Sequence, residues 1–402
     1  MKRSFADILA GLNSDRARKV ARKLPEWAAV DAARRAAGLD PLEFPSALSL
    51  EQCSSSATAA YKVFLAGQAA AAQLIQLIID LTGGLGVDSW ALSRVAERVV
   101  YFERNAELAA AAERNFRRLG AAGIEVRCET VMPDTDLPEA DLIYADPARR
   151  DTAGHKVFLL EDCTPDILTL LPTLLRKAPA VLLKLSPMAD LAMLAERLGP
   201  ALREIHVVEL DGEVKELLCL LVRDAAPAEP DITVVRLSDQ AAATTQRQES
   251  TLRFRASEER MAEPVYAAGV QAGELLMEPC PALLKAGAFR LPCGRWGLRK
   301  LAPSTHLYLA PETQTVPGAP GAPFFKAWRI AEVLPFSTAS FKELKHRYPR
   351  AEITARNLPL GSDTLRKRLG IAPGGDVHIF ACRLADGNAV LLVCQKSACK
   401  IF

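Results

Sequence analysis

Residues 77–88 constrain the fold of this chain more than any other stretch. They read LIIDLTGGLGVD, an apolar run that ends in a carboxylate and continues into three glycines. A helical pattern runs from Asp88 to Glu97, so the segment predicts a strand, a loop and a helix. Such a loop suits a nucleotide-like ligand, because glycines let the backbone come close and a helix start offers unpaired N–H groups.

A second apolar run, residues 99–102, ends in Glu103, which is placed to accept both hydroxyls of a ribose. Two cofactors fit this pattern. A nicotinamide dinucleotide requires G-x-G-x-x-G, but Ser89 stands at the third glycine position, so that fingerprint is incomplete. S-adenosylmethionine needs no pyrophosphate cradle, and Asp80 at the strand end would face its methionine part. An ordinary glycine turn in an α/β domain is a third interpretation.

A third strand-like run, residues 141–145, leads into Asp146 and Pro147. This string resembles the Asp/Asn-Pro-Pro-aromatic motif of S-adenosylmethionine-dependent methyltransferases that act on amino nitrogens. The resemblance implies that the Asp146 carboxylate and the Pro147 carbonyl accept the N–H groups of the attacking nitrogen. Ala148 and Arg149 stand where a proline and a stacking aromatic residue are expected.

That departure leaves the stacking surface to other residues, with Tyr144, Phe158 and the N-terminal segment as candidates. Arg149 and Arg150 are candidates to hold a phosphate or the flat face of a base. The string is also similar to the Asp-Pro-Pro-Arg of RNA 5-methyluridine enzymes, which need a cysteine just after the fifth strand. Ser186 stands in that place, which argues against covalent attack on a pyrimidine carbon.

Several blocks resemble the bacterial THUMP-like methyltransferase family. The blocks are residues 51–55, 80–88, 184–188, 213–217 and 356–357, with the region around 366–367. The resemblance implies an α/β fold: a Rossmann-like class I methyltransferase sheet, with an N-terminal helical domain and a C-terminal α+β THUMP-like module. It also implies S-adenosyl-L-methionine as cofactor and an RNA partner, tRNA ahead of rRNA.

From these motifs and the resemblance we expect three groups of site residues. The catalytic candidates are Asp146, Pro147 and Lys184. The cofactor candidates are Asp80, Thr82, Gly83, Gly84, Gly86, Asp88, Glu103 and Glu129, the last placed by topology alone. The substrate candidates are Gln52, Ser54, Lys62, Arg149, Arg150, Glu213, Arg356, Arg366 and Lys367.

Two of these residues have plain structural alternatives. Lys184 ends the fifth strand and is either a buried partner for Asp146 or Glu213 or a lysine that extends its ammonium to solvent. Glu213, Lys215 and Glu216 lie by a turn, Asp211-Gly212, and either reach over the cleft or pair with one another.

The pattern of apolar runs divides the 402 residues into four parts. Residues 1–65 read as helices, and residues 66–224 alternate strand and helix, which predicts a mostly parallel sheet with helices on both faces. Residues 225–324 form a linker and a small ferredoxin-like region. Residues 325–402 predict a strand, helix, strand, helix and hairpin.

Charge is unevenly distributed along the chain. The net charge is +2, but residues 325–402 carry 13 Lys and Arg against 6 Asp and Glu, and residues 1–65 carry 10 against 7. Basic ends around an acidic centre suit a polyanion, although solvated helix faces give the same pattern. Residues 16–23 hold five cations on a predicted helix, with the same two interpretations.

Other features bound the location and chemistry. The nine cysteines and five histidines show no ligand spacing, so we expect no metal. The apolar run over residues 66–81 is too polar and short to cross a membrane, and the first residues lack the apolar core of an export signal. We therefore expect a cytoplasmic protein, whose oligomeric state the sequence leaves open.

The leading hypothesis is a methyltransferase that modifies a base nitrogen in structured RNA. A small-molecule or protein methyltransferase is one alternative. A non-catalytic RNA-binding protein that keeps the fold is the other.

Overall fold

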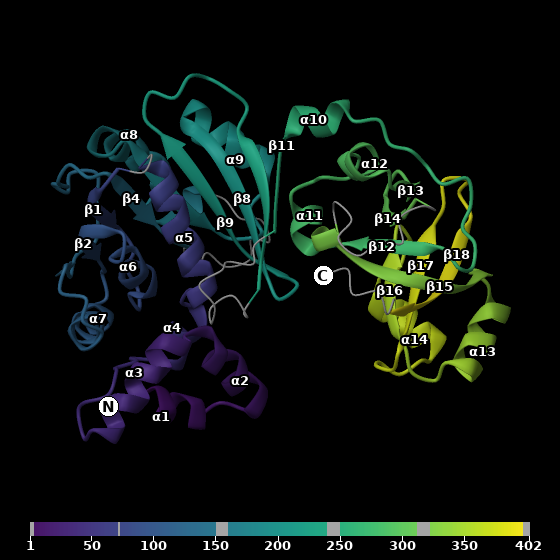
Figure 1. The fold of residues 1–402 in the computed structure, drawn as a ribbon, viewed down its shortest axis with the longest axis horizontal. Helices are drawn as coiled ribbons and strands as arrows, with labels where there is room; N and C mark the ends of the chain where they lie inside the picture. The colour runs from purple at the N-terminus through teal and green to yellow at the C-terminus, as the bar shows by residue number, and fades with distance from the viewer. Residues whose placement is uncertain (1–3, 71–72, 150–159, 239–249, 312–321, 397–402) are drawn as a thin grey trace. The chain divides into compact units, whose positions relative to one another are not determined.

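The computed structural model describes residues 4–70, 73–149, 160–238, 250–311 and 322–396 (Figure 1). The chain forms two compact units, Met1–Arg253 and Phe254–Phe402. Each unit is built on its own large sheet.

The first unit begins with five helices, which are α1 (Phe5–Ala10), α2 (Ser14–Lys23), α3 (Pro25–Ala36), α4 (Ala47–Gln52) and α5 (Ser56–Ala69). Local chemistry sets where they start. The Asn13 side chain accepts a hydrogen bond from the Arg16 backbone N–H (2.9 Å) and caps α2, and Pro25 occupies the first turn of α3. Trp27, fully buried, packs in a core that includes Leu85 and Val87. The helical segment is therefore packed onto the glycine loop.

A nine-stranded sheet follows, in the order β11-β10-β8-β9-β7-β4-β1-β2-β3. Its strands are β1 (Ile75–Asp80), β2 (Ala96–Phe102), β3 (Ile124–Arg127), β4 (Leu142–Ala145), β7 (Ala180–Leu185), β8 (Leu202–Leu210), β9 (Glu213–Val222), β10 (Asp231–Leu237) and β11 (Ser250–Arg255). Strands β3, β2, β1, β4 and β7 run parallel, and β9 is antiparallel to both β7 and β8. This is the predicted class I methyltransferase sheet, extended by β10 and β11.

Helices cover the sheet. They are α6 (Val87–Leu92), α7 (Ala106–Arg118), α8 (Ile167–Lys177) and α9 (Leu191–Leu198), and a separate two-stranded sheet joins β5 (Ala148–Arg149) to β6 (Cys163–Thr164). All four residues of β4 are buried, so both faces of the sheet are covered. The carboxyl ends of β1, β2 and β4 then meet at one edge, which is where α/β sheets bind ligands.

Three predicted boundaries differ from the structure. The helix after the glycine loop ends at Leu92 rather than Glu97, because Ala96 already pairs with β1. Residue 65 lies inside α5, a single helix whose Tyr61 and Leu65 belong to the sheet core. Beyond residue 224, β10 joins the sheet by parallel pairing with β8. The predicted division into four domains remains a prediction. The structure itself separates into the two compact units given above.

The second unit holds a seven-stranded sheet in the order β13-β14-β12-β15-β18-β17-β16. Its elements are α10 (Ala256–Met261), β12 (Leu275–Pro279), α11 (Pro281–Lys285), α12 (Leu291–Trp296), β13 (Arg299–Ala302), β14 (Thr305–Leu309), β15 (Phe325–Pro335), α13 (Thr338–Arg347), β16 (Glu352–Arg356), α14 (Ser362–Leu369), β17 (Val377–Arg383) and β18 (Ala389–Lys396). From β15 onward the order of elements is the predicted one. One sheet nevertheless runs across the predicted boundary at residue 324, because β12 pairs with β15.

Candidate active site

A cavity of about 370 Å³ opens at the carboxyl ends of β1, β2 and β4. All eight residues predicted to bind the cofactor line it, namely Asp80, Thr82, Gly83, Gly84, Gly86, Asp88, Glu103 and Glu129. They come from three separate stretches of sequence, residues 80–88, Glu103 and Glu129. The fold therefore gathers on one cavity the residues that the motifs selected separately.

The glycines of the loop are needed for packing as well as for access. A Cβ on Gly83 would lie 1.9 Å from the Tyr101 ring, and one on Gly86 would lie 2.5 Å from the Phe116 ring. Gly86 also has a φ of +87°, which glycine adopts at little cost. The Tyr101 hydroxyl donates to the Gly84 carbonyl oxygen (2.5 Å). The loop thus lies directly on two aromatic rings that the sequence motif does not reveal.

Asp80 lines the cavity but is almost fully buried. Its carboxylate accepts hydrogen bonds from the Thr82 backbone N–H (3.0 Å) and from the Ser89 hydroxyl (2.5 Å). Burial raises the pKa of this carboxyl to about 7 despite those donors. Asp80 therefore orders the glycine loop, and its charge changes close to neutral pH.

Glu103 is held in place by the backbone. Its two carboxylate oxygens accept from the N–H groups of Gly84 (2.9 Å) and Asn105 (2.8 Å). A carboxylate fixed in this way at the end of β2 suits the hydroxyls of a ribose. Glu129, after β3, lines the same cavity, although the sequence placed it there only by topology.

Asp146 is fixed from two sides. Its backbone N–H donates to the Thr82 hydroxyl (2.6 Å), which ties the end of β4 to the glycine loop. The Lys184 ammonium, from the end of β7, donates to its carboxylate. Of the two sequence interpretations of Lys184, the structure thus has the pairing with Asp146. Burial would lower the pKa of Lys184, but Asp146, Glu216 and Asp88 together raise it, so Lys184 stays an ammonium.

Behind these residues lies a buried network of charges around Lys62. The Lys62 ammonium contacts Glu216 (2.9 Å), the Ser54 hydroxyl (3.0 Å) and Asp88 (3.3 Å). Asp88 also accepts from Ser54 (2.7 Å) and from the Tyr144 hydroxyl (2.8 Å). Burial raises the pKa of Glu216. For Asp88 the charges of Lys62 and Lys184 outweigh burial, and the pKa is lowered.

One substrate candidate needs correction, and for a second the structure decides between two interpretations. Lys62 was expected to wall the active site, but its side chain is fully buried, because two carboxylates hold its ammonium inside the protein. Of the two sequence interpretations of Glu213, the structure has the pairing, because its side chain is 63% exposed and pairs with Lys215 and Lys19. Glu216, three residues later, occupies the buried position instead. The sequence feature that could have indicated its burial is the apolar run that begins at Leu217, directly after Glu216.

The remaining unit 1 candidates have mixed outcomes. Gln52 and Ser54 line the cavity, and Pro147 is buried beside Asp146. Arg149 belongs to β5, but its side chain is outside what the structure describes. Arg150 and the stacking candidate Phe158 also lie outside the described residues.

The lining of this cavity fits S-adenosylmethionine. Glu103 would hold the ribose, the glycine loop would face the methionine part, and Asp80 would lie near its ammonium group. Asp146 lines the same cavity.

Comparisons with known proteins bear on the whole chain. A family model described as "THUMP domain-like" matches residues 325–396, and one described as "ferredoxin-like domain" matches residues 275–317. A solved structure of a "putative methyltransferase" from Porphyromonas gingivalis W83 is 33% identical, with a TM-score of 0.74, over 98% of this chain and 95% of that one. This chain belongs to the bacterial THUMP-like-domain class I methyltransferase family.

More distant solved structures match only part of this chain. An rRNA methylase from Streptococcus thermophilus is 12% identical, with a TM-score of 0.30, over 40% of this chain and 96% of that one. A tRNA (m1A58) methyltransferase from Aquifex aeolicus is 14% identical, with a TM-score of 0.32, over 44% of this chain and 71% of that one. Nothing about substrate follows from scores this low. A search of curated proteins found no match.

The THUMP-like domain of this family member contains the other three substrate candidates, and two of them are paired with carboxylates. Arg356 lies 3.8 Å from Glu278. Arg366 lies 3.5 Å from Glu352 and 3.3 Å from Asp363. Lys367 is exposed on α14. The basic cluster seen in the sequence is therefore partly neutralised in the fold.

Within the described residues, no group of three or more His, Cys, Asp and Glu side chains is arranged to hold a metal ion. Over the same part of the chain, no helix has the length and apolar character needed to cross a membrane.

Proposed function

We propose that this protein transfers the methyl group of S-adenosylmethionine to a base nitrogen in structured RNA, with tRNA ahead of rRNA, in the cytoplasm. The observation that carries the proposal is the position of Asp146. It directly follows β4 and lines a cavity that fits the cofactor, and its backbone and side chain are held by Thr82 and Lys184.

Methyl transfer is an in-line displacement, so the main task of the protein is to position the acceptor. S-adenosylmethionine, when bound, supplies a methyl group on a positively charged sulfur. Asp146 would accept N–H groups of the acceptor nitrogen, orient its lone pair and stabilise the positive charge that grows there. The Pro147 carbonyl would accept a second N–H group. Lys184 remains charged, so it positions Asp146 and does not act as a base.

The RNA part of the proposal rests on different observations. The THUMP domain-like match covers residues 325–396, and residues 325–402 carry 13 Lys and Arg against 6 Asp and Glu. With two of the arginines paired, binding would rely on exposed cations such as Lys367 and on RNA shape.

The test is incubation of the purified protein with methyl-labelled S-adenosylmethionine and size-fractionated RNA, followed by nucleoside analysis. We expect label in a tRNA or rRNA fraction, and we expect Asp146→Ala to abolish it while S-adenosylhomocysteine still binds. Full transfer by Asp146→Ala would contradict the proposal. Binding of S-adenosylhomocysteine without label in any RNA would favour a small-molecule or protein acceptor, and no binding would favour the non-catalytic alternative.

A further inference from the structure

A second cavity, of about 450 Å³, adjoins the first. Gln52, Cys53 and Ser54 line both cavities. Lys184 lines the second cavity, while its partner Asp146 lines the first. A molecule in the second cavity would therefore reach Lys184, the partner of Asp146.

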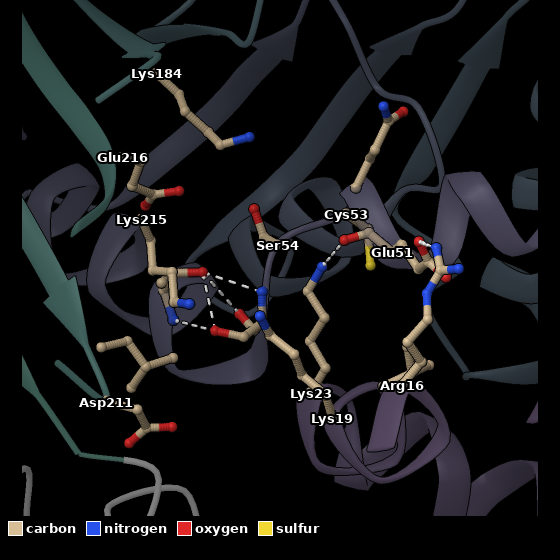
Figure 2. Close-up of a pocket in the computed structure, with 15 residues that line it drawn as sticks. Arg16, Lys19, Lys23, Glu51, Cys53, Ser54, Lys184, Asp211, Lys215 and Glu216 are labelled. Atoms are coloured by element: carbon tan, nitrogen blue, oxygen red, sulfur yellow. Dashed lines mark hydrogen bonds and ion pairs between the residues drawn. The ribbon is translucent and has the colours of Figure 1, made fainter. Parts of the chain in front are cut away.

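One wall of this cavity is a single face of α2. Arg16, Lys19 and Lys23 line it, at the spacing of three and four residues that places side chains on one side of a helix. Figure 2 shows the three side chains coming from α2. Arg22, on the same helix, is exposed and is not part of the lining. The sequence left open whether these cations meet phosphate or only solvent, and the fold directs three of them into a cavity.

The opposite wall carries charges of both signs. Lys215 and Glu216 come from β9, and Asp211 from the turn before it (Figure 2). In all, five lysines and arginines line the cavity against three aspartates and glutamates. Three of the cations have local tasks: Arg16 pairs with the Glu51 carboxylate (2.7 Å), Lys23 donates to the Glu51 carbonyl oxygen (2.6 Å) at the end of α4, and Lys184 pairs with Asp146.

The two remaining lysines already share an anion. The Glu213 carboxylate accepts from the Lys215 ammonium and lies 3.8 Å from the Lys19 ammonium. The Glu213 side chain is 63% exposed, so it can rotate away into solvent at little cost. The position between Lys19 and Lys215 is therefore one where a negative charge is favoured and where the present occupant is replaceable.

We propose that the second cavity receives one nucleotide of the acceptor, with its phosphate between Lys19 and Lys215 in place of the Glu213 carboxylate. The base would then point toward Asp146, an orientation that rests on the proposed function. The phosphate site itself does not depend on methyl transfer. A free nucleotide and a nucleotide within an RNA chain share this chemistry, and the experiment separates them.

The test is calorimetric titration of the full-length protein with the four nucleoside 5′-monophosphates, the matching nucleosides and a single-stranded tetranucleotide. We expect one or more monophosphates to bind about tenfold more tightly than their nucleosides, as a charge-assisted hydrogen bond allows. Lys19→Ala and Lys215→Ala should remove most of that preference. Arg22→Ala makes the same charge change on α2 outside the cavity and should leave it intact.

Glu213→Ala gives the opposite expectation, because it removes the competing carboxylate. It should tighten monophosphate binding and leave nucleoside binding unchanged. A tetranucleotide that binds more tightly than any monophosphate identifies an RNA chain as the source, and equal binding identifies a free nucleotide.

The inference is wrong if monophosphates bind no better than nucleosides, or if Lys19→Ala and Lys215→Ala behave like Arg22→Ala. Binding of S-adenosylhomocysteine, measured in parallel, separates this failure from that of the proposed function. If RNA becomes labelled but monophosphates bind no better than nucleosides, only the phosphate site is overturned. A phosphate preference without cofactor binding would overturn only the transferase.

Discussion

The Lys62 ammonium and the Glu216 carboxylate form an ion pair with 0% and 3% of their side chains exposed, although 154 residues separate them in sequence. Lys62 lies on α5 and Glu216 on β9. The pair therefore fixes α5, the helix before the sheet, to β9, a strand within the sheet. Ser54 and Asp88, which bond to the same group of side chains, line the candidate active site.

Removing the ammonium from this network should destabilise the protein strongly. We expect Lys62→Met to lower the free energy of unfolding by about 3–5 kcal/mol, because it removes the cation that Glu216 and Asp88 contact inside the protein. Urea unfolding followed by circular dichroism measures this. The double variant Lys62→Met/Glu216→Met should recover part of the loss, and a double variant as unstable as the single one would contradict the pairing.

The glycine loop should not tolerate a methyl group at Gly83. A Cβ there would overlap the Tyr101 ring, so Gly83→Ala is expected to cost about 1–3 kcal/mol, as overpacking does, and to weaken S-adenosylhomocysteine binding. Thermal unfolding and calorimetry measure the two effects. Gly67→Ala is the control, because Gly67 lies in α5 with nothing within 4 Å of its Cβ position. That change should stabilise the helix by about 1 kcal/mol.

Cofactor affinity should depend on pH through Asp80. Its pKa is raised to about 7 by burial, and the ammonium group of S-adenosylhomocysteine would be favoured by the ionised carboxylate. We expect affinity to fall as pH drops below about 7, by up to about tenfold per pH unit. Calorimetry at several pH values tests this, and Asp80→Asn should bind weakly with a flat profile. Equal pH dependence in both proteins would count against Asp80.

The free energy of unfolding gives a second check on the Asp80 carboxyl, because it should fall as pH rises whereas cofactor affinity should rise. The folded protein holds the Asp80 proton up to about pH 7, whereas the unfolded chain releases it near 3.8. This group therefore lowers the free energy of unfolding as pH rises from about 4 to 7, by about 1.4 kcal/mol per pH unit at most. Asp80→Asn should remove this loss, so the variant should gain stability relative to the natural protein at pH 8.

Lys184 should act by positioning Asp146. We expect Lys184→Met to slow methyl transfer by about 100-fold, the cost of a misplaced catalytic group, with little change in S-adenosylhomocysteine affinity. Lys184→Arg keeps the charge and should restore part of the rate. Rates measured from pH 7 to 10 should show no change caused by deprotonation of Lys184, since the pKa of its ammonium is raised above the ordinary value. A rate that rises with deprotonation of a lysine would indicate a base instead.

The sequence by itself determined much of the fold and selected eight residues that line the cavity of the candidate active site. Periodicity located the strands that carry Asp80, Glu103 and Asp146, because apolar runs that end in a carboxylate are local features. The order of elements after residue 325 followed in the same way. Parallel strands then bring their carboxyl ends to one edge, so the cavity itself was predictable from topology.

Only the tertiary structure decided which charged side chains meet. Local sequence could not tell that Lys62 is buried between Asp88 and Glu216, that Glu213 faces solvent, or that Arg356 is paired with Glu278. Nor could it show that Lys19 and Lys215 lie on either side of one carboxylate. The physical reason is that the burial and the partners of a charged group depend on segments far apart in the chain, whereas strand and loop patterns depend on neighbouring residues.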